Sequence, residues 1–217
     1  MINSEYVKKQ IDNTKIIAII RALDFEDIDG VTDALVKGGI RAIEFTIDHR
    51  EADCLNSNAK KIRYIKKTYG DQICVGAGTV INLNEAQAMI DVGAEYIVSP
   101  NADIDVIRYT KSKNVVSIPG AMTPTECFAA YEAGADYVKL FPAGELGLKY
   151  VKALKAPLNH IPFLLVGGID LDNMKDFLDL GVKGFGLGSN LVLSEAVKQK
   201  NYKLIEEKTR TFILKCI

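Results

Sequence analysis

The sequence is poor in the residues that build metal centres, since its only two histidines, His49 and His160, lie more than a hundred positions apart. A catalytic zinc site usually needs two or three histidines together with carboxylate or cysteine ligands. The four cysteines are well separated and form no CxxC motif: Cys54, Cys74, Cys127 and Cys216. This usage is typical of reduced thiols in a cytosolic protein. We therefore expect no metal and no cofactor, and we keep Cys127 only as a minor candidate nucleophile.

Charge of one sign and long apolar runs are also lacking. The formal net charge is -1, which gives no indication of nucleic acid or of an anionic membrane as a partner. The longest apolar runs, such as residues 16–20, are far too short to span a bilayer, and the N-terminal residues show no secretory signal. We expect a cytoplasmic protein whose 217 residues form one domain.

Four segments resemble one another, each with a glycine, a short polar step and a β-type run. They cover residues 36–46, 91–100, 132–142 and 179–188. The glycine suits a helix C-terminus, where the backbone turns left-handed, and the following run suits a strand. A unit of helix, glycine and strand that recurs every 20 to 30 residues is typical of a parallel α/β fold.

The rest of the chain completes eight such units. Strands are predicted near 16–21, 42–46, 74–78, 96–99, 115–119, 137–141, 163–166 and 184–187. Helices are predicted at 26–37, 51–68, 82–92, 103–112, 123–133, 145–155 and 170–180, with Asn82, Thr123 and Asp170 as N-caps, one more before the first strand and more from 189 onward. The pattern predicts a (β/α)8 TIM barrel with an extra N-terminal helix. A doubly wound sheet is the alternative, but no GxGxxG turn follows the first strand.

A lysine lies in the middle of an apolar strand, YVKLFP at 137–142. Burial lowers the pKa of an ammonium group, and an unprotonated amine attacks carbonyl carbons. Lys139 is therefore a candidate Schiff-base nucleophile, and the alternative is a lysine that reaches out of a strand end to water.

Strand alternation predicts a carboxylate close to this lysine. In AIEFT at 42–46, Ile43 and Phe45 suit the helix-covered side, so Glu44 should point into the barrel, as Lys139 and Phe141 should by the same parity. The two residues could form a structural ion pair. Replacing a buried ion pair by apolar residues is often neutral or stabilising, so stability alone is a weak reason for such a pair. A carboxylate beside an amine can instead move the protons that imine chemistry requires.

Glycines and prolines mark the predicted barrel mouth. Gly167, Gly168, Gly188 and Ser189 follow the last two strands, where barrels commonly bind phosphate, and a helix starting at Ser189 would direct its dipole there. The alternative is two tight turns that need glycine. Prolines are expected to close three consecutive strands and to form a rigid apolar rim: Pro100, Pro119 and Pro142.

Seven of these motifs, taken in order, resemble the 2-keto-3-deoxy-6-phosphogluconate aldolase family and its 2-dehydro-3-deoxy-6-phosphogalactonate sister. They are AIEFT at 42–46, VGAGT at 75–79, SP at 99–100, IPG at 118–120, VKLFP at 138–142, VGGI at 166–169 and LGS at 187–189. The resemblance implies a class I aldolase that cleaves a phosphorylated 2-keto-3-deoxy sugar acid to pyruvate and glyceraldehyde 3-phosphate. It also implies a homotrimer that needs no metal.

The resemblance implies a role for each matching position. Lys139 would form the Schiff base and Glu44 would be the general acid and base. Thr79 would hold the pyruvate carboxylate, while Phe141 and Pro100, with Pro119 on the rim, would pack around the imine. Gly167, Gly168, Gly188 and Ser189 would bind phosphate.

One position departs from the family pattern. The gluconate branch commonly has an arginine four residues after the glutamate, and this chain has Asp48 there, with Arg50 two residues on. A carboxylate would repel the substrate's own carboxylate. Either Asp48 points away or Arg21 supplies the positive charge. Two other functions remain open: an isomerase or decarboxylase that uses Lys139 electrostatically, and a phosphosugar-binding barrel without turnover.

Overall fold

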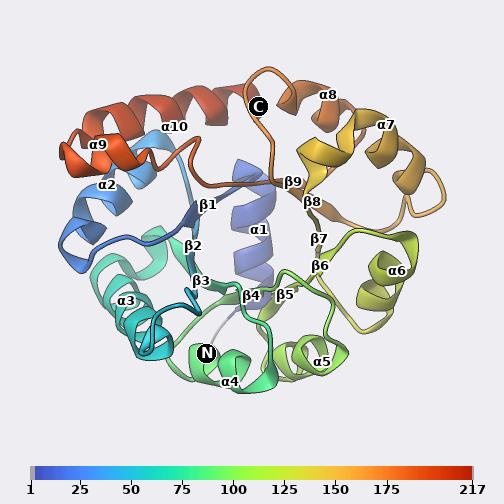
Figure 1. The fold of residues 1–217 in the computed structure, drawn as a ribbon, viewed down its shortest axis with the longest axis horizontal. Coiled ribbons are helices and arrows are strands. Elements are labelled where there is room, and N and C mark those ends of the chain that lie inside the picture. Colours follow the sequence, from blue (N-terminus) through green and yellow to red (C-terminus); the bar gives the residue numbers. More distant parts are fainter. Residues whose placement is uncertain (1–2, 217) are drawn as a thin grey trace.

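The computed structural model describes residues 3–216 and shows a ring of parallel strands surrounded by helices (Figure 1). The strands are β1 (Ile16–Ile20), β2 (Ala42–Thr46), β3 (Cys74–Gly78), β4 (Tyr96–Val98), β5 (Val116–Ile118), β6 (Gly120–Ala121), β7 (Val138–Leu140), β8 (Phe163–Val166) and β9 (Gly184–Leu187). The helices are α1 (Ser4–Thr14), α2 (Ile28–Gly38), α3 (Cys54–Tyr69), α4 (Leu83–Asp91), α5 (Ile104–Ser112), α6 (Pro124–Glu132), α7 (Ala143–Lys155), α8 (Met174–Asp179), α9 (Ser194–Lys198) and α10 (Tyr202–Cys216). The predicted barrel is confirmed.

The ring closes through one strand that is divided in two. The order runs β5-β4-β3-β2-β1-β9-β8-β7-β6, and its two ends, β5 and β6, are separated in the chain only by Pro119. β5 pairs with β4 and β6 pairs with β7, so the chain itself joins the two edges. The prediction that Pro119 ends a strand is confirmed for β5, although the chain resumes as β6 directly after it. Proline lacks an N–H and interrupts the ladder, yet its carbonyl still accepts the N–H of Lys139 at 2.8 Å.

Two separate apolar layers follow from strand alternation. In β2, Ala42 belongs to the cluster inside the barrel, whereas Ile43 and Phe45 belong to the cluster between the strands and the outer helices. Val7 and Ile11 of α1 join the inner cluster. Figure 1 accordingly shows α1 behind the strands in the middle of the ring, where it covers the end at which the strands begin. The expected N-terminal helix is confirmed, and the site must open at the other end.

Local signals set most helix ends. Gly39, Gly93, Gly134 and Gly181 all have positive φ, between 73° and 110°, and each donates its N–H back to a carbonyl of the preceding turn. Asn82 caps α4 through the N–H of Glu85, so that prediction is confirmed.

The other two predicted caps differ in outcome. Thr123 and Glu126 form a capping box that starts α6, as expected for the predicted N-cap. Asp170 does not begin α8: its carboxylate accepts the N–H groups of Asp172 and Asn173, and the helix starts only at Met174. Among residues 3–216, no helix has the length and apolar character needed to span a bilayer.

Candidate active site

Lys139 lies inside the barrel, as its alternation predicts. It occupies the middle of β7 and is 7 % exposed, while its neighbours Val138 and Leu140 face the outer helices. Loss of hydration lowers the pKa of its ammonium group, and the positive charge of Arg21 lowers that pKa further, against an opposing effect of Glu44. More of the side chain is therefore unprotonated near neutral pH than in a lysine at the surface.

Glu44 enters the same space from β2 and is 3 % exposed. Burial raises the pKa of its carboxyl, and the charges of Lys139 and Arg21 oppose that rise. No ion pair within 4.0 Å joins Glu44 to Lys139 in the described part of the chain. A tight structural ion pair is thus not what the barrel holds. A carboxyl with a raised pKa can carry a proton and release it during a reaction.

Glycine at position 78 makes room for this carboxylate. A Cβ built there would lie 1.7 Å from Oε1 of Glu44, far inside contact distance. Gly78 is the cross-strand partner of Thr46, two residues beyond Glu44. Glu44 therefore requires glycine at position 78, the second glycine of the VGAGT motif. The sequence pattern alone did not reveal this requirement.

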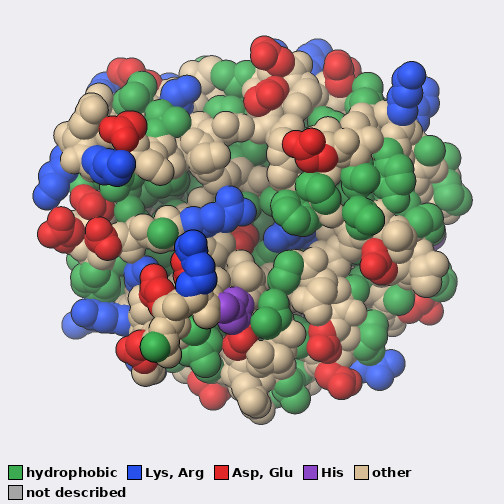
Figure 2. All heavy atoms as spheres, viewed as in Figure 1, with side chains coloured by type: hydrophobic (Ala, Val, Ile, Leu, Met, Phe, Trp, Pro, Cys, Tyr) green, Lys and Arg blue, Asp and Glu red, His purple; other side chains and the backbone are tan. Residues whose placement is uncertain are grey.

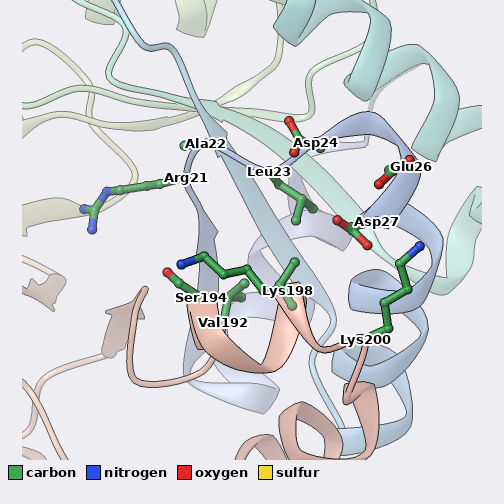
Figure 3. Close-up of a pocket in the computed structure, with 11 residues that line it drawn as sticks. Arg21, Ala22, Leu23, Asp24, Glu26, Asp27, Val192, Ser194, Lys198 and Lys200 are labelled. Carbon is green, nitrogen blue, oxygen red and sulfur yellow. The ribbon is translucent and has the colours of Figure 1, made fainter.

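Arg21 is a cation at the barrel mouth whose side chain is not paired with any described acid. Its guanidinium makes no hydrogen bond or ion pair with another described residue, and Nη1 lies 3.1 Å from a Cβ built on Gly188. Arg21 also lines a second pocket, of about 400 Å³ beside α9, and Figure 3 shows its guanidinium extending away from the acids of that pocket, Asp24, Glu26 and Asp27. Lys and Arg side chains gather around the hollow at the centre of this face (Figure 2). An unpaired guanidinium at this place is available for an anionic ligand.

Asp48 is engaged by its neighbour on the same loop. Both oxygens accept from Arg50, at 2.8 Å from Nε and 2.6 Å from Nη2. These hydrogen bonds lower the pKa of Asp48 to about 2. Arg50 is thereby held by Asp48, and neither residue acts on the pKa of Lys139 or Glu44. Pairing with Arg50 offsets the charge of Asp48, and Arg21 is a positive charge without such a pairing among the described residues, so the two explanations for position 48 are compatible.

The residues predicted to bind phosphate do meet in one cavity of about 270 Å³. Its lining includes Arg21, Phe141, Gly167, Gly168, Gly188 and Ser189. Gly167 and Gly168 have φ of 84° and 68°, a conformation that favours glycine, so backbone rather than side chains forms this wall. The lining residues include one cation and no acid, which suits an anion. Sequence analysis missed Asn190, whose amide donates to the carbonyl of Ile169 and orders this loop.

The expected helix at Ser189 is wrong. Leu191 and Val192 donate to the carbonyl of Gly188 and close a single turn, and α9 begins only at Ser194. The helix dipole invoked for the phosphate is therefore absent at this position. The glycine backbone and Arg21 remain as the cavity's features for an anion.

Three other predicted residues surround the mouth. Thr79 follows β3 with φ 59°, which a β-branched side chain rarely adopts and which often marks a functional position. Pro100 follows β4, and its carbonyl packs so closely on Gly120 that a Cβ there would lie 2.4 Å away. The ring of Phe141 lies with its centroid 5.4 Å from Nζ of Lys139.

The remaining nucleophile candidate is poorly placed. Cys127 is fully buried in α6, and burial raises the pKa of its thiol to about 12. The same thiol would need a depressed pKa to react. Within residues 3–216, no three His, Cys, Asp or Glu side chains gather in a way that could hold a metal ion.

Curated proteins resemble the chain over most of its length. A "Probable 2-dehydro-3-deoxy-6-phosphogalactonate aldolase" of Rhizobium meliloti is 37% identical over 177 residues, 81% of each chain. The "2-dehydro-3-deoxy-6-phosphogalactonate aldolase" of Escherichia coli is 35% identical over 177 residues, 81% of this chain and 83% of that one. The "2-dehydro-3-deoxy-phosphogluconate aldolase" of Treponema pallidum is 32% identical over 169 residues, 77% of each.

Solved structures agree with these relatives. A structure described as "Native KDPGal structure" is 32% identical with a TM-score of 0.81 and covers 92% of this chain and 93% of its own. A KDPG aldolase from Legionella pneumophila, with pyruvate captured as a covalent carbinolamine, has a TM-score of 0.83 at 26% identity and covers 94% and 97%. The family described as "Aldolase: KDPG and KHG aldolase" matches residues 7–208. The chain belongs to this family and is a class I aldolase.

Proposed function

We propose that this chain cleaves 2-dehydro-3-deoxy-6-phosphogalactonate, or its C4 epimer the 6-phosphogluconate, to pyruvate and glyceraldehyde 3-phosphate. The observation that carries the proposal is a buried lysine with a lowered pKa beside a carboxyl with a raised one, next to a cavity suited to an anion. The two relatives at 35% and 37% identity carry the galactonate name and favour that epimer.

The reaction begins with the neutral amine of Lys139. It attacks the C2 carbonyl and gives a carbinolamine, whose hydroxyl leaves as water after Glu44 donates a proton. The protonated imine then withdraws electrons while Glu44, now a carboxylate, takes the proton of the C4 hydroxyl. The C3–C4 bond breaks to release the aldehyde. Protonation of the enamine at C3 and addition of water release pyruvate and return Lys139.

The neighbouring residues hold the two ends of the substrate. Arg21, Gly167, Gly168, Gly188 and Ser189 bind the phosphate, because they line the cavity that lacks an acid. Thr79 holds the carboxylate at the opposite side. Phe141, Pro100 and Pro119 form the apolar wall, which keeps water from the imine until the aldehyde has left.

We also propose that the protein is a cytoplasmic homotrimer. Exposed apolar side chains outside the site support an interface: Met122, Phe128 and Leu148 are between 39 % and 47 % exposed. Figure 2 shows apolar side chains gathered to one side of the central hollow, over α6 and α7. Light scattering on the purified chain would give three times the monomer mass if the proposal holds, and a monomer would contradict it.

Borohydride trapping with pyruvate tests the nucleophile. We expect one adduct of pyruvate on Lys139, identified by peptide mass spectrometry, and none in Lys139→Arg. Lys155→Arg is the matched control, because burial also lowers the pKa of Lys155, which lies on α7 outside the barrel and donates to the carbonyl of Gly181. Both epimeric substrates are then assayed for pyruvate release. Turnover without an adduct on Lys139 would refute the imine mechanism.

A further inference from the structure

Three residues on neighbouring strands form one row across the barrel interior. In the register of the parallel ladder, Glu44 of β2 pairs with Gly76 of β3, and Gly76 pairs with Tyr96 of β4. Side chains at the same level of neighbouring strands point the same way. The middle residue, Gly76, has no side chain, so the space above it can be occupied by a side chain from a neighbouring strand.

Tyr96 fills that space. A Cβ built on Gly76 would lie 2.2 Å from Cε2 and 2.3 Å from Cδ2 of the ring, so the ring lies flat across the glycine. The side chain is fully buried, and its hydroxyl donates to the carbonyl oxygen of Ile43. Tyr96 therefore passes over β3 and is anchored on β2, at the residue directly before Glu44.

The anchor bears on Glu44 in two ways. The hydrogen bond holds the peptide that joins Ile43 to Glu44. The backbone from which the Glu44 side chain extends is therefore fixed by a residue of β4. The ring also occupies volume that water would otherwise enter below the carboxylate. Burial is the first cause of the raised pKa of the Tyr96 phenol, and the charge on Glu44 is the second, which places the two groups within electrostatic reach.

We propose that Tyr96 is a positioning residue for Glu44, holding its peptide through the Ile43 carbonyl and keeping water from beneath its carboxylate. The inference rests on the proposed role of Glu44 as proton carrier. Tyr96 does not touch the substrate, and its effect passes through the orientation and hydration of Glu44. A tyrosine that only filled the core would change stability and leave the proton transfer as it is.

Tyr96→Phe tests the hydroxyl without changing the ring. We expect kcat to fall about tenfold, the loss that accompanies one weakened hydrogen bond of ordinary strength, with KM within twofold. The limb of the pH–rate profile that belongs to Glu44 should move to lower pH, because water entering near the carboxylate favours its charged form. Tyr96→Leu, which also removes most of the ring, should move the same limb further.

Tyr137→Phe is the matched control. Tyr137 is also buried inside the barrel, but its hydroxyl donates to Asp12 of α1 at the closed end. This variant should lose stability and keep the wild-type kcat and pH profile. If Tyr96→Phe behaves like Tyr137→Phe, the positioning role is refuted. Glu44→Gln separates the two proposals: if it retains full kcat the proposed role of Glu44 fails, and if it is inactive while Tyr96→Phe is unaffected only the inference about Tyr96 fails.

Discussion

Adding one methyl group at position 78 should disable the aldolase through Glu44. In Gly78→Ala the new Cβ would lie 1.7 Å from Oε1, whereas ordinary contact begins near 3.4 Å. The carboxylate must therefore withdraw by about 1.7 Å or the strand must move. Misplacing a reacting group by about 1 Å can cost about 10²-fold in rate, so we expect kcat to fall at least that far.

The variant should fold, because position 78 does not have the left-handed backbone that would exclude alanine. Overpacking of this kind typically costs about 1–3 kcal/mol of unfolding free energy. The cost should nearly vanish in the Glu44→Ala background, where the conflicting side chain is gone. Urea unfolding of the four proteins of this double-mutant cycle measures the coupling, and release of pyruvate coupled to lactate dehydrogenase measures kcat.

Two results would refute the reasoning. The first is a kcat for Gly78→Ala within threefold of wild type, which would mean that Glu44 works equally well from a displaced position. The second is an equal unfolding cost with and without the Glu44 side chain, which would mean that Gly78 serves the backbone rather than the carboxylate.

Three further outcomes are expected. Arg21→Met removes a like charge that lowers the pKa of Lys139. The pH at which cyanoborohydride trapping of pyruvate is half-maximal should therefore rise. An unchanged midpoint would count against Arg21 as the local cation. Thr79→Gly relieves a φ of 59° and should raise the unfolding free energy by about 0.5–1 kcal/mol while weakening pyruvate binding. The control is Lys200→Gly, at φ 52° on the surface, which should raise the unfolding free energy by a similar amount with no effect on pyruvate binding. Gly168→Ala should raise KM for the phosphorylated substrate and leave the pyruvate adduct unchanged, as KM measurements and trapping would show. A φ of 68° is strained for alanine, and its Cβ would lie 3.0 Å from Cα of Gly144, so the loop must shift.

Local physics explains why much of the fold could be predicted. A left-handed turn at the end of a helix requires glycine whatever surrounds it, so the four glycines before the strands marked helix ends correctly. Strand alternation likewise placed Glu44 and Lys139 inside the barrel, since the parity of a strand is a property of its own backbone. Both signals act within a few residues of the chain.

The mispredictions share a different cause. Ser189 and Asp170 were expected to begin helices, but each belongs to a turn at the barrel mouth, and the helices start later. Loops at the mouth take their shape from packing against neighbouring loops, and no sequence window contains those neighbours.

The sequence by itself determined the barrel, the inward direction of Lys139 and Glu44, and the resemblance to an aldolase family. Only the tertiary structure decided that Arg21 is the cation that acts on Lys139, and that Tyr96 crosses Gly76 to reach β2. The physical reason is register. Which side chains stand at one level of a closed barrel depends on how the strands are staggered when the ring closes, and that stagger brings together residues that are tens of positions apart in the chain.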